Sequence, residues 1–225
     1  MNIRTLKSTT KDIALHGLAA VRELMGAESR FGIRGAYEHR DRYCYFDDTA
    51  LADEYQKEVY VRAAEIARDA NARTVYDIGC GSGYKLVNYL GQYDTVGFDV
   101  PETLEFLHKK YPDRSWAHVP FSDRSRPPAD LVICSDVIEH VLDPDELVGF
   151  LLSVTRKWLV LSTPDRGREY PTLSRHQLGP PHTDHHIREW NFKEFRRYID
   201  RFVDVHEHVH PNAAHATQMI VATRR

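Results

Sequence analysis

Residues Asp77-Ile78-Gly79-Cys80-Gly81-Ser82-Gly83 form the stretch that decides the fold of this chain. The residues Thr74-Val75-Tyr76 predict a short buried strand before it, and residues 84–90 predict a helix after it. Glycine at every second position permits a tight turn and lets a ligand approach the bare backbone. An acidic residue opens the turn, which suits a ligand with positive charge or hydroxyl groups better than the pyrophosphate of a dinucleotide.

The chain around this stretch alternates between strand and helix patterns. A strand pair without an intervening helix closes the chain at 202–208 and 217–223. Such alternation predicts an α/β fold: a Rossmann-like, doubly wound, mostly parallel seven-stranded sheet with an antiparallel edge strand and an N-terminal helical cap. The other strands are expected at 74–78, 95–98, 116–119, 131–134 and 158–162, with helices at 84–90, 102–111, from 143 onward and at 191–199.

The N-terminal part differs from this pattern. Apolar residues at helical spacing predict an amphipathic helix over 11–26, and Asp47-Asp48-Thr49 predicts the start of a second helix that ends near 70. We expect residues 1–70 to form a helical cap or lid within the same domain. Simple packing of these residues on the sheet is the alternative. Residues 71–225 would then form the ligand-binding core, with a substrate loop at 163–190.

Composition limits the function. A chain of 225 residues with a net charge of −3 can form one core, and it has no basic field that would attract nucleic acid. We see neither a signal peptide nor a run of about 20 apolar residues, so we expect a cytoplasmic protein without a membrane partner. The three cysteines have no metal or redox spacing. The sequence is compatible with a homodimer.

Four segments together resemble the class I methyltransferases, which depend on S-adenosylmethionine (SAM). The matching segments are 77–83, the strand 96–99 that ends in an acidic residue, the strand and turn 129–141, and the strand 159–164. The resemblance is strong over 74–165 and extends over 190–225 in topology only. It implies SAM as cofactor, S-adenosylhomocysteine as product, and a small-molecule acceptor.

The resemblance assigns cofactor roles to matched positions. Gly79 and Gly81 would approach the methionine end of SAM with their backbone, and Asp77 would act near its ammonium group. Asp99 would accept hydrogen bonds from the ribose diol, because a carboxylate accepts twice. Asp123 is the nearest acidic candidate for the adenine, with a surface loop as the alternative, and Val119 and Phe121 could hold the base between them. The remaining predicted cofactor residues are Cys80, Gly83, Val100, Ser135 and Asp136.

Histidines supply the candidates for catalysis. A hydroxyl acceptor needs a general base, and the pKa of histidine lies near neutrality. His140 follows strand 131–134, although a packing role is common at this position, and His185 and His186 lie in the 163–190 loop. The acceptor is expected to contact Tyr43, His182, Arg188, Glu189 and Trp190. The alternative for residues 188–190 is that they anchor the loop to the sheet.

A metal site is the competing interpretation of the histidines. His182, Asp184, His185 and His186 could supply ligands, and so could the alternating His206, His208 and His210. Neither group has a second ligand set, so we predict no metal. The expected reaction is methyl transfer from SAM to a small hydroxylated acceptor, at oxygen, with a sugar of a natural product or glycan as the acceptor. The alternatives are N-methylation of a small molecule, an NAD-dependent oxidoreductase, and a non-catalytic SAM-binding module.

Overall fold

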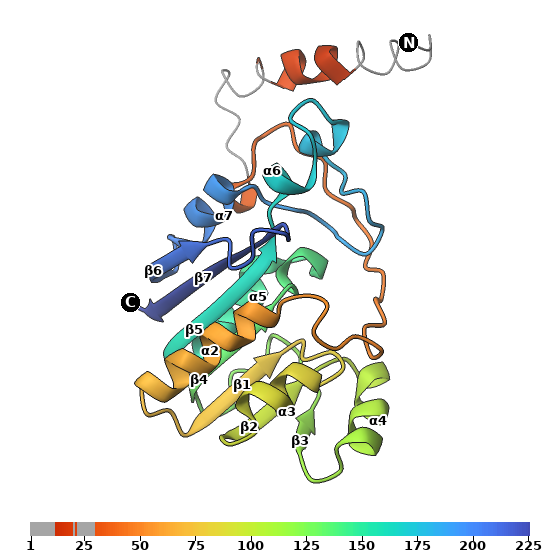
Figure 1. The fold of residues 1–225 in the computed structure, drawn as a ribbon. Coiled ribbons are helices and arrows are strands. Elements are labelled where there is room, and N and C mark those ends of the chain that lie inside the picture. The colour runs from red at the N-terminus through yellow and green to blue at the C-terminus, as the bar shows by residue number, and fades with distance from the viewer. Residues whose placement is uncertain (1–11, 20, 22–29) are drawn as a thin grey trace.

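A seven-stranded sheet runs through the centre of the protein (Figure 1). The structure is a computed structural model that describes residues 12–19, 21 and 30–225. The strand order is β3-β2-β1-β4-β5-β7-β6. The strands are β1 (Thr74–Ile78), β2 (Asp94–Phe98), β3 (Ser115–Ala117), β4 (Ala129–Ser135), β5 (Thr155–Pro164), β6 (Val203–Val209) and β7 (Thr217–Arg224).

The pairing confirms the predicted sheet. Strands β3, β2, β1, β4 and β5 pair in parallel, whereas β7 is antiparallel to both β5 and the outermost strand β6. The order along the sheet reverses between β1 and β4. At such a switch point the loops after neighbouring strands diverge and leave a crevice at the carboxyl ends.

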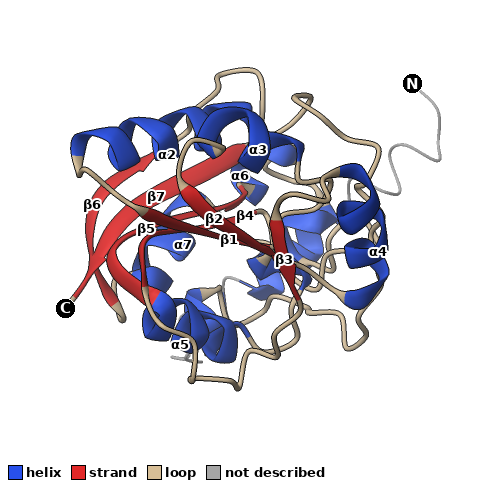
Figure 2. Cartoon of the chain, turned by 90° about the horizontal axis from the view of Figure 1, so that it is seen from below, coloured by secondary structure: helices blue, strands red, loops and turns tan. Residues whose placement is uncertain are grey.

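Helices cover both faces of the sheet (Figure 2). In β4, Leu131 and Ile133 belong to one hydrophobic cluster and Val132 and Cys134 to the other, so the continuous apolar run is buried on both sides. The helices are α2 (Lys57–Asp69), α3 (Tyr84–Leu90), α4 (Pro101–Lys110), α5 (Pro144–Val154), α6 (Arg166–Glu169) and α7 (Phe192–Ile199), with short 3₁₀ turns η1 (Arg30–Gly32), η2 (Ile138–His140) and η3 (Arg175–Leu178).

Side-chain caps begin two of these helices where the sequence predicts them. Asp143 accepts hydrogen bonds from the backbone N–H groups of Asp145 and Glu146 at the start of α5. At the start of α7, Asn191 and Glu194 form a reciprocal capping box. These caps satisfy N–H groups that have no partner within the helix.

The helix predicted from residue 49 is wrong at its start. Asp47 does accept hydrogen bonds from the N–H and hydroxyl of Thr49, but it closes only a local turn. Gln56 then adopts a left-handed conformation with φ of 61°, and α2 begins after it at Lys57. The third strand is also shifted, because β3 ends at Ala117 before Val119.

Residues 12–19 are helical, as predicted, and the rest of the predicted 11–26 helix except residue 21 lies outside the described residues. The side chains of Ile13, Leu15 and Leu18 are about half exposed, and only Ala19 among the apolar residues of 12–19 is buried. Among the described helices, none combines the length and apolar character that crossing a lipid bilayer requires.

Candidate functional site

A cavity of about 660 Å³ opens at the carboxyl ends of the parallel strands. This volume is in the usual range for small-molecule sites. One end of the cavity, the glycine end, follows β1 and β2 and contains Gly79, Cys80, Asp99 and Val100. The other, the histidine end, follows β4 and β5 and contains Glu139, His140, His185, His186 and Glu189.

The glycine turn after β1 is held tightly in place. The N–H of Gly79 donates to the carbonyl of Phe98 at 2.8 Å. Gly79 has a φ of +74°, and a Cβ atom there would lie 2.3 Å from Cγ2 of Val137. Only glycine combines this conformation with so close a neighbour. Cys80 also lines the cavity, whereas Gly81 and Gly83 are buried in the turn.

Asp99 faces the cavity at the end of β2. Its Oδ2 accepts from the N–H of Gly81 at 2.8 Å, and its Oδ1 accepts from the N–H of Val100 at 2.8 Å. Burial raises the pKa of Asp99, while these donors lower it. A side-chain hydrogen bond from Thr103 also lowers this pKa. A carboxylate has about four acceptor positions, so Asp99 can still accept from a further hydroxyl group.

Asp77 lies beneath the cavity wall instead of lining it. Its side chain is 0 % exposed and accepts from the hydroxyl of Tyr60, at 3.0 Å for Oδ2. Burial raises the pKa of Asp77 to about 7, although the Tyr60 hydrogen bond acts in the opposite direction. Tyr60 itself lines the cavity, so any effect of Asp77 on a ligand passes through this ring or the turn.

The candidates for the adenine differ in position. Val119 and Phe121 both line the cavity. Asp123 does not, because its Oδ1 accepts from the N–H of Ser125 at 2.8 Å within its own surface turn. The position of Asp123 therefore matches the surface-loop alternative, and this residue is not part of the cavity.

A hydrogen-bonded group lies at the end of β4. Asp136 has a φ of 54°, and its Oδ1 accepts from the hydroxyl of Ser162 at 2.6 Å. Its Oδ2 accepts from the side-chain amide of Gln56 at 3.0 Å. Ser135 contacts Ser162 at 2.8 Å between hydroxyl oxygens, and Ser135 and Asp136 both line the cavity as expected.

The structure brings His140, His185 and His186 together at the histidine end. The Nδ1 of His140 lies 2.9 Å from the carbonyl oxygen of His185. The Nδ1 of His186 lies 2.6 Å from Oε1 of Glu189. Burial lowers the pKa of His140 to about 4. The ring of Phe46 stacks against that of His140 with centroids 6.4 Å apart, which places an aromatic wall beside the imidazoles.

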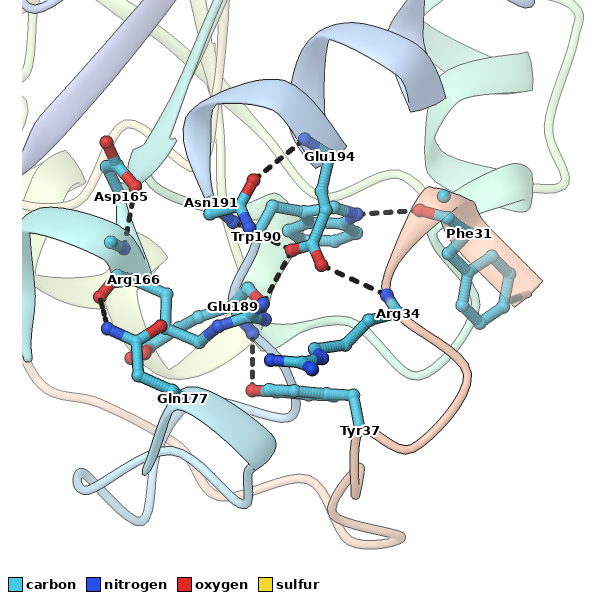
Figure 3. Close-up of polar contacts among 12 residues, drawn as sticks. Phe31, Arg34, Tyr37, Asp165, Arg166, Gln177, Glu189, Trp190, Asn191 and Glu194 are labelled. Atoms are coloured by element: carbon cyan, nitrogen blue, oxygen red, sulfur yellow. Dashed lines mark hydrogen bonds and ion pairs between the residues drawn. The ribbon is translucent and has the colours of Figure 1, made fainter. Parts of the chain in front are cut away.

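Arg188 and Trp190 anchor the loop instead of lining the cavity (Figure 3 shows Trp190). Arg188 donates to the carbonyls of Val141 and Leu142, each at 2.7 Å. The indole N–H of Trp190 donates to the carbonyl of Phe31 at 2.7 Å. Both contacts match the anchoring alternative. Glu189 does line the cavity. Its backbone is held in place, because its N–H donates to the hydroxyl of Tyr37 at 3.0 Å.

A buried ion pair fixes the same loop to α7 (Figure 3). Arg166 and Glu194 meet at 2.7 Å with side chains that are 1 % and 4 % exposed. Arg166 also donates to the carbonyl of Glu189, and Glu194 accepts from the N–H of Arg34 at 3.0 Å. The loop that carries His186 and Glu189 is thereby tied both to α7 and to the segment after η1.

Residues 43–56 cross the cavity, and they carry functional candidates that the sequence analysis missed. Tyr43, which was expected to contact the acceptor, lines the cavity there. Asp48 and Gln56 line it as well and were not among the predicted residues, and neither were the neighbouring Tyr60 and Lys85. Asp48 lies against Gly81, and burial raises its pKa to about 6. Gln56 was missed because 49–70 was interpreted as one helix, and Asp48 was missed because it was interpreted as part of the start of that helix. The available signal was the density of acidic and aromatic residues in a segment without helical periodicity.

The potential metal ligands differ from those weighed above. In the described part of the chain, Glu139, His140 and His186 bring one ligand atom each to within 4.8 Å of one another. Asp184 instead pairs with Arg40 at 3.0 Å, and His208 stacks on Phe192 with centroids 3.6 Å apart. His182 lines the cavity next to His176. Glu139 was absent from the candidate sets because the sequence does not show its proximity to His186.

A family model and several solved structures are similar to this chain. A family model described as "Methyltransferase domain" matches residues 38–212. No curated protein matches the chain in sequence. The methyltransferase domain of a bacterial Hen1 has 23 % identity and a TM-score of 0.58, with 75 % of this chain and 98 % of that chain covered.

Two further solved structures share the fold. The magnesium protoporphyrin IX methyltransferase ChlM from Synechocystis PCC 6803, with bound S-adenosylhomocysteine, has 15 % identity and a TM-score of 0.58, with 93 % and 95 % of the two chains covered. An O-methyltransferase family protein from Burkholderia thailandensis has 17 % identity and a TM-score of 0.57, with 75 % and 56 % covered.

Proposed function

Because the chain belongs to the class I SAM-dependent methyltransferase family, we propose that it transfers a methyl group to a hydroxyl oxygen of a small, polyhydroxylated acceptor. A sugar of a natural product or glycan is the acceptor class that we favour. The observation that carries the proposal is the histidine end, where imidazoles and carboxylates converge beside one aromatic ring. The dinucleotide oxidoreductase alternative is wrong, because the family uses SAM as methyl donor.

The glycine end supports the placement of SAM. Asp99 would accept hydrogen bonds from the ribose, and Val119 with Phe121 would contact the adenine. The backbone at Gly79 would lie along the methionine part, with Ser135 and Asp136 next to it. This placement directs the sulfonium methyl from the glycine end toward the histidine end of the same cavity.

The histidine end supports a hydroxyl acceptor. Its side chains offer acceptor atoms, which pair with the O–H groups of a polyol and disfavour a phosphate-rich acceptor such as nucleic acid. In the transfer, the acceptor oxygen forms a bond to the methyl carbon while the carbon–sulfur bond breaks and its electrons return to sulfur. The hydroxyl proton has to leave, and an amine acceptor would instead need only to be neutral.

Segment 43–56 would act as the lid of this site. Tyr45 contacts Thr103 at 3.2 Å between oxygens, and Lys85 donates to the carbonyl of Ala52 at 3.1 Å. Tyr43 and Phe46 lie on the cavity side of the segment. A closed lid would hold the acceptor in line with the methyl group.

The test is a product analysis with ¹³C-methyl-labelled SAM. The purified protein is incubated with panels of free sugars, glycosides and primary amines, and methylated products are identified by mass spectrometry and by the ¹³C shift of the methyl group. We expect O-methyl products from the sugar or glycoside panel, and their loss when S-adenosylhomocysteine is added in excess. Methyl groups found only on nitrogen would contradict O-methylation. Bound SAM without transfer to any panel would favour the non-catalytic module.

A further inference from the structure

Three side chains at the histidine end converge with one unused ligand atom each. Glu139 and His140 lie in η2, directly after β4, and His186 lies in the loop after β5. Their ligand atoms all lie within 4.8 Å of one another. The sequence separates His186 from the other two by more than forty residues, and the anchoring of the 163–190 loop brings it beside them.

Glu139 contributes a buried carboxylate oxygen without a partner. Its Oε2 accepts from the hydroxyl of Thr163 at 2.9 Å, which fixes the carboxylate. Its Oε1 has no hydrogen-bond partner in the described part of the chain, although the side chain is 0 % exposed. A buried oxygen without a partner is costly, and it commonly marks the position of an ion or a bound water.

The two histidines are held so that their second nitrogens are free. The carbonyl of His185 can only accept, so the Nδ1 of His140 donates to it at 2.9 Å and the Nε2 of His140 keeps its lone pair. The Nδ1 of His186 donates in the same way to Glu189 at 2.6 Å. Metal-binding histidines typically donate their other N–H to a backbone carbonyl or a carboxylate, and both forms occur here.

The spacing leaves room between the ligand atoms. The Nε2 of His140 lies 4.0 Å from Oε1 of Glu139, and this distance is too long for a hydrogen bond. Ligand atoms at about 2.1 Å from a common ion lie roughly 3–3.5 Å apart. The pair at 4.0 Å would have to close by about 0.5–1 Å to share a cation, and a pair at 4.8 Å by about 1.3–1.8 Å.

We propose that Glu139, His140 and His186 form a binding site for one divalent transition-metal ion. Two imidazole nitrogens and one carboxylate oxygen suit ions such as Zn²⁺, Mn²⁺ or Co²⁺. Three protein ligands leave coordination positions open toward the cavity, as in catalytic metal sites. His140 and His186 then act as ligands, and neither is the general base.

This site deepens the proposed function and rests on it for its role. A divalent ion would bind the acceptor hydroxyl and lower its pKa, so that the proton leaves to water and the oxygen attacks the methyl group of SAM. Open positions on one ion favour an acceptor with two neighbouring hydroxyl groups, which can occupy both. The substrate class therefore narrows from polyols in general to those with a vicinal diol.

The first test measures metal binding without any acceptor, so it does not depend on the reaction. Tag-free, full-length protein is stripped with a chelator and titrated with Co²⁺, followed by visible absorption, and with Mn²⁺ and Zn²⁺, followed by calorimetry. We expect one ion per chain. Glu139→Gln and His186→Asn should each weaken metal binding by at least about tenfold. Changing a residue that only hydrogen-bonds to a metal ligand already has an effect of this size.

His206→Asn is the matched control, because His206 lies on the edge strand β6 and contacts Thr223 at 2.8 Å, away from the cavity. It should bind the ion as the unmodified protein does. All three variants should bind SAM with unchanged affinity, because SAM binding depends on the glycine end. Unchanged SAM binding would show that the variants are folded. Absence of saturable binding, or equal binding by the Glu139→Gln and His186→Asn variants, would overturn the site.

A second test separates the site from the proposed function. O-methylation of a diol should cease when the ion is removed and return when it is restored. Full activity in chelator would overturn the catalytic role of the ion. One ion bound per chain, combined with transfer to nitrogen only, would leave the metal site standing while refuting the proposed O-methylation.

Discussion

Two backbone N–H groups hold the carboxylate of Asp99 at the end of β2. We predict that Asp99→Ala weakens SAM binding by about 1.5–3 kcal/mol, the range for hydrogen bonds to a charged group. Isothermal titration calorimetry with SAM measures the change. Asp123→Ala is the matched control and should keep the affinity, because Asp123 lies outside the cavity. An unchanged affinity in Asp99→Ala would remove this residue from the ribose site.

We predict that Asp77 makes the free energy of unfolding depend on pH. Burial raises its pKa from 3.8 to about 7 in the folded protein, so the folded state retains a proton that the unfolded chain releases. Its stabilising contribution is therefore present below pH 3.8 and is lost as the pH rises to about 7. The two pKa values differ by about 3, and each unit corresponds to about 1.4 kcal/mol, so the loss is about 4 kcal/mol.

The measurement is urea unfolding of the unmodified protein and Asp77→Asn at several pH values between 4 and 8. Asn cannot titrate but can still accept from Tyr60, so the variant isolates the ionisation. The unmodified protein should lose unfolding free energy relative to the variant as the pH rises. Parallel pH profiles for the two proteins would show that Asp77 has an ordinary pKa.

At the scale of elements, the buried pair Arg166–Glu194 joins the 163–190 loop to α7. We predict that Glu194→Ala lowers the free energy of unfolding by about 3–5 kcal/mol, because it leaves a buried guanidinium without its partner. Urea unfolding measures this loss. Glu105→Ala breaks the exposed pair with Lys109 and should cost no more than about 0.5 kcal/mol. Similar small losses in both variants would mean that the loop does not depend on the buried pair.

The boundaries of helices and strands show where local sequence signals are sufficient to predict the structure. The strand–turn–helix unit at 74–90 and the caps at Asp143 and Asn191 follow from local patterns, and the structure confirms them. Residues 49–56 carry a local capping signal as well, but tertiary contacts override it. Gln56 bonds to Asp136, and Lys85 bonds to the carbonyl of Ala52, so the segment is held across the cavity in a non-helical path.

At the scale of the whole molecule, the cavity is assembled from segments that are far apart in the chain, so a ligand there should stabilise the entire fold. We predict that SAM at 100 times its Kd raises the free energy of unfolding by about 2.7 kcal/mol. Thermal unfolding measured with SAM, S-adenosylhomocysteine and NAD tests this. The first two should raise the Tm, and NAD should not. A Tm raised by NAD alone would contradict the assignment of the glycine end to SAM.

The sequence by itself determined the fold class and the residues of the glycine end of the cavity. Their determinants are local: three glycines, the acidic residues at 77 and 99, and apolar runs whose period identifies strands and helices. Only the tertiary structure decided the histidine end. It placed Arg188 and Trp190 in anchoring contacts, moved Asp123 out of the site, and brought Glu139 beside His186. Those outcomes depend on how loops after β4 and β5 pack against each other and against residues 31–56, and no local pattern in the sequence encodes such long-range packing.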